Sequence, residues 1–251
     1  MTGIVRRDLL PVLIVAALFA ASAYAGITLT RESSRIAMLW LPNAIVAAWL
    51  LRSAVNVPFM LLVCALANIA ANRIVGDDWP TAVSLTLANM AEIAAVVWIM
   101  RRTCGPMPDM TKIASHGWLL AAATAGAALS GALAMSALTY HGIAIAAGDW
   151  QRWVLADGLS LLIVLPILLI GIDSFRNRYR PSRQVAIEWA TMAAMVTAGS
   201  ILVFMQARFP FLFLASPLII YAAFRTGVAG TAAAVLIVTI VATGATALGS
   251  G

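Results

Sequence analysis

The chain has 251 residues, of which 63% are hydrophobic and 10% are charged, and its formal net charge is +6. Ordinary soluble domains carry roughly 25% charged residues. This composition therefore excludes an ordinary soluble domain and indicates a protein that crosses the membrane several times.

Nine apolar segments follow one another along the chain, and we predict an all-α polytopic membrane bundle of eight or nine spans. Two segments, 39–52 and 211–224, are short, and each contains a proline, Pro42 or Pro217. Because the connections are brief, we expect one transmembrane domain over 1–251. The segments are 9–29, 39–52, 55–72, 80–100, 113–140, 150–172, 184–205, 211–224 and 227–248.

The first segment allows two interpretations. Arg6 and Arg7 precede an apolar stretch that ends in an Ala-x-Ala-like sequence at 23–25, a pattern typical of a secretory signal peptide. The same stretch is long enough to cross the membrane. We interpret it as an uncleaved first span.

The basic residues predict the orientation of the chain. With a cytoplasmic N-terminus, eleven Lys and Arg residues fall on the cytoplasmic side and five on the other side, as the positive-inside rule requires. Loop 173–183 is the strongest cytoplasmic marker. The positive charge thus reflects topology, and no basic groove with interleaved aromatic residues appears, so no nucleic-acid partner is expected.

An odd number of spans raises a problem at the end of the chain. Nine crossings from a cytoplasmic start place Gly251 outside. Either one short segment is re-entrant, or a final helix that follows 227–248 is absent from this sequence. We expect segments 211–224 and 227–248 both to cross.

Motifs for catalysis or metal binding are missing from the sequence. Cys64 and Cys104 form no CxxC pair, and His116 and His141 have no partner at metal-ligand spacing. No P-loop, nucleophile-elbow or dinucleotide-binding motif is present. We therefore expect no catalytic residue, no metal ligand and no cofactor, and we do not interpret the chain as an enzyme.

Polar residues inside apolar segments are the most informative feature. Asn89 and Glu92 lie three residues apart and share one helix face. Asn68, Asn43 and Asp157 lie in other segments, with a serine one turn after Asp157. Such groups can join helices by hydrogen bonds worth under about 2 kcal/mol each. For the two carboxylates we favour a functional role, because a charge at the bilayer centre costs about 2.5–3.5 kcal/mol.

The tryptophans divide into two groups by position. Trp79, Trp98, Trp150 and Trp153 lie near segment ends, where aromatic belts form at the membrane surface. Trp40, two residues before Pro42, is instead placed for a pocket.

Five stretches together resemble the bacterial membrane-associated sensor domain of the first type (MASE type one), in order and spacing over nearly the whole chain. They are LWLPNAIVAAWLL at 39–51, ALANI at 65–69, LANMAE at 87–92, WQRWVLADGLSLLIVLP at 150–166 and SPLIIYAAFRTGVAG at 216–230. The resemblance implies a sensory input module of the bacterial inner membrane that lies N-terminal to a cytoplasmic histidine kinase, diguanylate cyclase or cyclic-di-GMP phosphodiesterase. It also implies a further helix toward that output domain.

The resemblance and the polar residues together predict an intramembrane ligand site. Its residues are Trp40, Asn43, Asn68, Asn89, Glu92, Asp157 and Tyr221. The expected partners are membrane lipid, an unidentified small-molecule or protein signal, and a second copy of the chain in a homodimer. The alternative is the substrate-binding membrane component of a vitamin-like uptake system, which a stop codon soon after residue 251 would favour.

Overall fold

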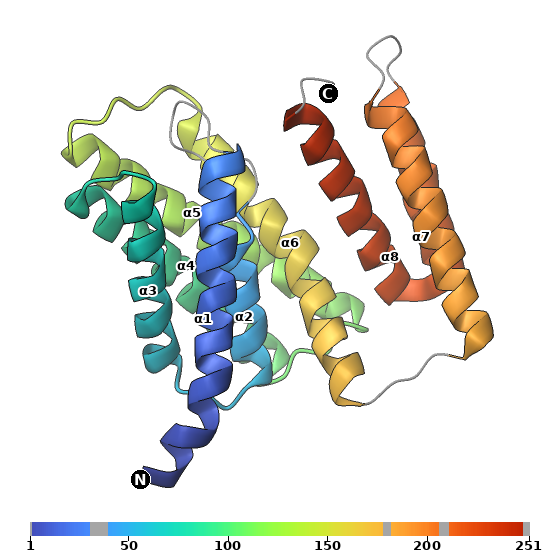
Figure 1. Ribbon diagram of the computed structural model, residues 1–251, viewed down its shortest axis with the longest axis horizontal. Coiled ribbons are helices and arrows are strands. Elements are labelled where there is room, and N and C mark those ends of the chain that lie inside the picture. Colours follow the sequence, from blue (N-terminus) through green and yellow to red (C-terminus); the bar gives the residue numbers. More distant parts are fainter. Residues whose placement is uncertain (1, 31–39, 178–181, 206–210, 248–251) are drawn as a thin grey trace. The chain divides into compact units, whose positions relative to one another are not determined.

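The structure, a computed structural model, describes residues 2–30, 40–177, 182–205 and 211–247. It divides the chain into two compact units, Met1–Leu169 and Ile170–Gly251. Within the described residues every regular element is a helix (Figure 1), as predicted. The elements are α1 (Thr2–Thr30), α2 (Pro42–Arg52), α3 (Val57–Ile74), α4 (Trp79–Cys104), α5 (Ile113–Tyr140), α6 (Asp149–Arg176), α7 (Arg183–Phe204), the 3-10 helix η1 (Phe211–Leu214) and α8 (Ala215–Ala247).

Seven of the described helices are long and apolar enough to cross a membrane, so the predicted count of eight or nine is too high. The first difference is at 39–52. The helix there, α2, has 11 residues and a length of roughly 16 Å, about half of the 30 Å hydrocarbon layer. Residue 39 lies outside the described residues. The segment is a half-length helix and not a full span.

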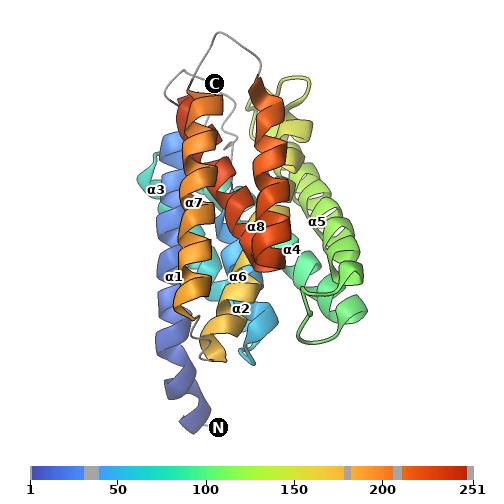
Figure 2. The same ribbon diagram turned by 90° about the vertical axis from the view of Figure 1, so that its right-hand side faces the viewer.

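The second difference concerns 211–224 and 227–248. The structure places 211–224 and 227–247 within η1 and α8, residue 248 lies outside the described residues, and α8 counts as one candidate span, Ala215–Thr246. However, Gly227 interrupts α8 with φ 62° and ψ −157°, and Figure 2 shows that the two halves run in opposite directions. The first half, 215–226, is about 18 Å long, too short to cross by length alone.

Packing in the second unit agrees with this reversal. Ala222 and Ala234 lie on opposite sides of Gly227, yet both belong to one buried cluster with Met192 and Val196 of α7. In an uninterrupted helix these two alanines would be about 18 Å apart. The turn therefore folds both halves of α8 against α7.

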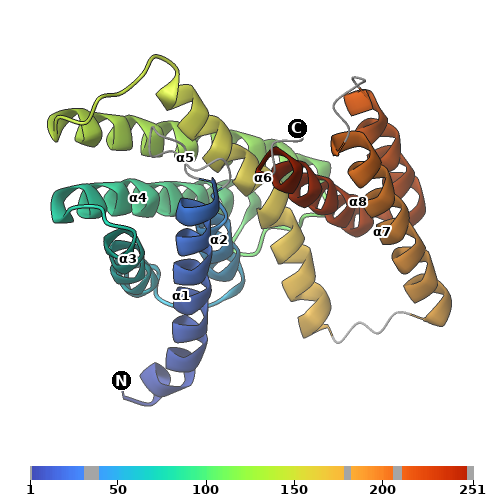
Figure 3. The ribbon, with the colours of Figure 1, turned by 45° about the horizontal axis from the view of Figure 1, so that its top comes forward.

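In the first unit, α4 and α5 pack along each other in opposite directions (Figure 3). A small residue allows their close approach. A Cβ atom built on Gly126 of α5 would lie 2.8 Å from Val96 Cγ2 and 3.4 Å from Glu92 Cγ of α4. Real Cβ atoms do not approach this closely, so a larger residue at 126 would move α5 away from the helix face that carries Glu92.

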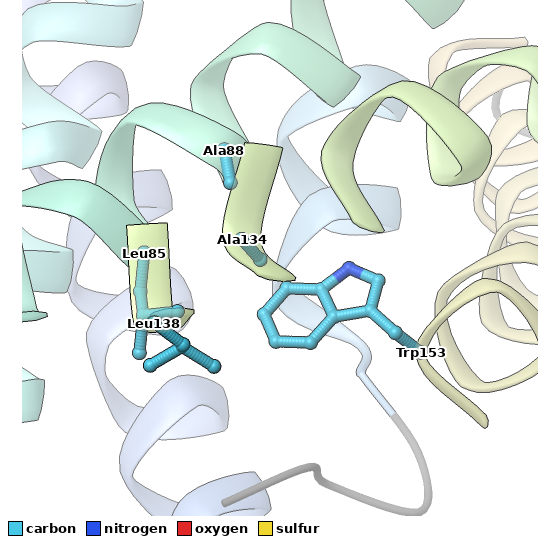
Figure 4. Packing of buried hydrophobic residues seen from close by; sticks show 5 residues of the cluster. All are labelled: Leu85, Ala88, Ala134, Leu138 and Trp153. Carbon is cyan, nitrogen blue, oxygen red and sulfur yellow. The ribbon is translucent and has the colours of Figure 1, made fainter. Parts of the chain in front are cut away.

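An apolar cluster joins α6 to this pair. Trp153 of α6 packs with Ala134 and Leu138 of α5 and with Leu85 and Ala88 of α4 (Figure 4). In that view the indole nitrogen lies on the edge of the ring away from Leu138. The predicted aromatic belt is thus wrong for Trp153, which is buried, whereas Trp79, Trp98 and Trp150 are exposed.

Arginine side chains lie at both ends of α4 in the first unit. At the end where α2 and α4 terminate, Arg52 donates to Pro108 O (2.7 Å) and Arg101 donates to Leu50 O (2.6 Å). At the opposite end of α4, the Arg73 guanidinium lies 4.9 Å from the centre of the Trp79 ring. The side chains of the basic residues before position 9 and between 31 and 39 lie outside the described residues. The cytoplasmic location of the N-terminus stays a prediction.

Candidate functional site

The short helix α2 positions the candidate site. Nine of its eleven residues are buried, as expected for a helix surrounded by others. Pro42 occupies the first turn, where its missing N–H is tolerated. Just before the helix, the Trp40 backbone N–H donates to Ser160 Oγ of α6 at 2.9 Å. The chain therefore enters α2 from inside the bundle, beside the middle of α6.

Asn43 is the centre of a buried hydrogen-bond network. Its Nδ2 donates to Glu92 Oε2 at 2.7 Å and to Asn89 Oδ1 at 3.2 Å. Its Oδ1 accepts from Trp40 Nε1 at 3.2 Å. Asn43 and Glu92 are both 0% exposed. The predicted sharing of one helix face by Asn89 and Glu92 thus serves to bind a single amide from α2.

Asp157 brings a second carboxyl group to Glu92. It lies on α6, is 4% exposed, and its carboxyl group interacts directly with that of Glu92. Ser130 also interacts with the carboxyl group of Glu92, and Trp153 with that of Asp157. However, the buried atoms Glu92 Oε1 and Asp157 Oδ2 have no hydrogen-bond partner among the described residues. Two carboxyl groups in contact away from water are costly unless they share a proton or receive another donor.

We call this group the amide–carboxyl cluster. It consists of Trp40, Asn43, Asn89, Glu92, Asp157 and Ser160. Three helices, α2, α4 and α6, contribute five of its members, and Trp40 lies just before α2. It contains five of the seven residues predicted for the ligand site.

Asn68 and Tyr221 are the two predicted residues outside the cluster. Asn68 Nδ2 donates to Thr86 Oγ1 of α4 at 3.0 Å, and Asn72 Nδ2 donates to Asn68 O at 2.9 Å. Asn68 therefore joins α3 to α4, which is the structural role considered for each asparagine. Tyr221 lies in α8 and belongs to the other unit, so it is described separately from the cluster.

The sequence predictions missed two neighbouring residues. Trp153 Nε1 donates to Ser130 Oγ of α5 at 3.1 Å, which satisfies the buried indole nitrogen beside the apolar cluster of Figure 4. Ser130 lies among glycines and alanines, a pattern that indicates close helix packing and does not distinguish this serine. The burial of Trp153 follows from the packing of α6 on α5, which no local pattern reports.

The chemistry available at the cluster is hydrogen bonding and proton exchange. Among the described residues, no group of three or more His, Cys, Asp or Glu side chains could hold a metal ion. Cys64 and Cys104 are free thiols. The cluster offers two facing carboxyl groups and two amides, which suit a ligand or partner that carries hydrogen-bond donors.

The family model MASE1 matches residues 11–251 of the chain. No curated protein and no solved structure matches it.

Proposed function

The chain belongs to the MASE1 family of membrane sensory domains, and from this premise we propose that it is a sensory input domain whose amide–carboxyl cluster detects a signal within the membrane. It passes that signal to a C-terminal cytoplasmic output domain, a histidine kinase, diguanylate cyclase or phosphodiesterase. The observation that carries the proposal is the pair of buried carboxyl groups, Glu92 and Asp157, with oxygens that lack donors.

The position of α2 explains how a local change would spread. This helix contacts α1 and α4, and the bonds of Asn43 and Trp40 join its start to α4 and α6. A proton, a small ligand or a polar group of a partner that meets Glu92 or Asp157 changes which bonds Asn43 can make. In this proposal α2 packs in two alternative ways, and the ligand binds one of them more tightly. Binding then shifts the population toward that state, which is how a signal arises.

We also propose that the domain lies in the inner membrane with its N-terminus in the cytoplasm. The support is the distribution of Lys and Arg residues in the sequence, eleven on the predicted cytoplasmic side and five on the other, together with seven candidate spans. An output domain in the cytoplasm requires a connection that ends on the same side as the basic loops.

The test uses the protein expressed from its complete gene. We expect Glu92→Gln and Asn43→Leu to change the basal output, measured as cyclic-di-GMP concentration or autophosphorylation, by about fivefold or more, the usual scale of coupling between sites. Asn72→Ala, which removes a buried amide outside the cluster, is the matched control and should leave the output unchanged.

Two results would contradict this function. If both cluster variants have wild-type output while the protein is folded and inserted, the cluster is structural. If the reading frame stops soon after residue 251, the substrate-binding component of an uptake system becomes the better assignment.

A further inference from the structure

A groove lies between the first turn of α3 and the last turns of α4, apart from the amide–carboxyl cluster. Its volume is about 320 Å³, within the range of pockets that hold small molecules. Its lining residues are Val57, Ala94, Val97, Trp98, Arg101 and Arg102. Four apolar side chains thus meet two guanidinium groups at the end of a candidate membrane span.

The apolar part of the groove lies on a surface that suits hydrocarbon. Trp98 is 68% exposed, and on the neighbouring helix Phe59, Leu62 and Leu66 form an exposed stripe at helical spacing. An exposed apolar surface on a membrane-spanning helix faces lipid chains. Trp98 lies one turn before the arginines, as expected for a ring at the level of the headgroups.

The charged part of the groove consists of Arg101 and Arg102. Arg101 uses Nη2 to bond Leu50 O at the C-terminus of α2, where a cation is favourable. Arg102 is exposed, and no carboxylate lines the groove. The groove is therefore lined by two positive charges, and none of its lining residues carries a negative charge to balance them.

We propose that this groove binds an anionic phospholipid, with the headgroup phosphate on Arg101 and Arg102 and the upper acyl chain on Val57, Ala94 and Trp98. Guanidinium groups bind phosphate oxygens strongly and in pairs. Basic pockets between membrane helices recognise anionic headgroups in the same way. A zwitterionic lipid would leave part of the positive charge unbalanced, so the groove selects for net negative lipid.

Native mass spectrometry of the purified chain tests the site. The protein is released from micelles that contain equal amounts of phosphatidylglycerol and phosphatidylethanolamine with identical acyl chains. We expect preferential retention of phosphatidylglycerol and about a fivefold loss of that preference in Arg102→Gln, the effect of one basic residue near a membrane surface. Lys112→Gln removes the same charge at the same end but outside the groove, and should retain the preference.

A second pair of variants tests the apolar part. Ala94→Phe fills the groove and should reduce retention of both lipids, whereas Leu87→Phe, on an exposed position of the same helix, should not. Equal retention of the two lipids by the wild type overturns the proposal, as does an equal loss in Lys112→Gln and Arg102→Gln. Displacement of the lipid by millimolar inorganic phosphate would identify a free-anion site instead and also overturn it.

Discussion

Among single residues, Glu92 is a fully buried carboxyl group that requires hydrogen-bond partners within the first unit. It is fully buried, accepts a 2.7 Å hydrogen bond from Asn43, and contacts Asp157. A buried carboxyl group is tolerated when its neighbours satisfy it, and removal of one member leaves the others unpaired. The residues of the cluster are therefore coupled, and their substitutions should not be additive.

This coupling predicts different outcomes for two substitutions of Glu92. Glu92→Gln keeps the shape of the side chain, accepts from Asn43 and donates to Asp157, so its thermal unfolding should match that of the wild type. Glu92→Leu removes the acceptor of Asn43 and should lower the free energy of unfolding by about 1–3 kcal/mol. Differential scanning fluorimetry in micelles compares the midpoint of thermal unfolding of each variant with that of the wild type.

The control for these variants is Val83→Leu, on an exposed part of the same helix, which should unfold like the wild type. A Glu92→Leu variant as stable as Glu92→Gln would show that the bonds of Asn43 contribute nothing to stability.

At the scale of elements, two helices depart from a simple span. α2 begins inside the bundle because Trp40 and Asn43 find hydrogen-bond partners there on α6 and α4. In a membrane, irregular backbone is tolerated where protein surrounds it. α8 reverses at Gly227, and the turn depends on a second glycine, because a Cβ atom on Gly230 would lie 1.7 Å from Thr226 Oγ1.

The conformation of Gly227 predicts the effect of a substitution there. A φ of 62° with a ψ of −157° is accessible almost only to glycine and costs other residues about 1–3 kcal/mol. Because no atom lies within 4 Å of a built Cβ, Gly227→Ala should destabilise the protein through backbone strain alone. A lower midpoint of thermal unfolding in micelles would be the evidence.

Gly244 provides the matched control within the same helix. It also has open space around a built Cβ, and its φ is not positive. Gly244→Ala should be neutral or stabilise by up to about 1 kcal/mol, the difference in helix propensity. If both variants behave alike, the turn at Gly227 is not required.

At the scale of the whole molecule, the alternation of helices sets the sidedness of the loops. α6 is a candidate span from Asp149 to Arg176, so we expect the loops at its two ends on opposite sides of the membrane. The basic residues predict that 141–149 is periplasmic and 173–183 cytoplasmic, although residues 178–181 of the second loop lie outside the described residues.

Cysteine labelling of intact cells tests this orientation. In a Cys104→Ser background, a membrane-impermeant maleimide should label Ala147→Cys and should label Asn177→Cys only after lysis. Both positions are exposed, and the remaining native thiol, Cys64, is 0% exposed. Gly148 is a poorer position, because its φ of 102° disfavours any side chain. Labelling of Asn177→Cys alone in intact cells would reverse the orientation.

The all-helical membrane class, the positions of most helices and the shared face of Asn89 and Glu92 could all be predicted from the sequence. Each of these depends on residues close in the chain, since hydropathy and helical spacing are local properties. Pro42 at the start of α2 and Gly227 within α8 mark the places where these two helices depart from a simple span. Neither residue type alone predicts the direction that the chain takes there.

Three features of the site could be known only from the packing of the helices: Asn43, Glu92 and Asp157 meet, Asn68 bonds elsewhere, and Trp153 is buried. These outcomes depend on how closely the helices approach, which small residues such as Gly126 permit at particular depths. The hydropathy of an apolar segment does not depend on which neighbouring helix its polar residues face. The partner of each buried amide and carboxyl group is therefore selected by packing between segments far apart in the sequence.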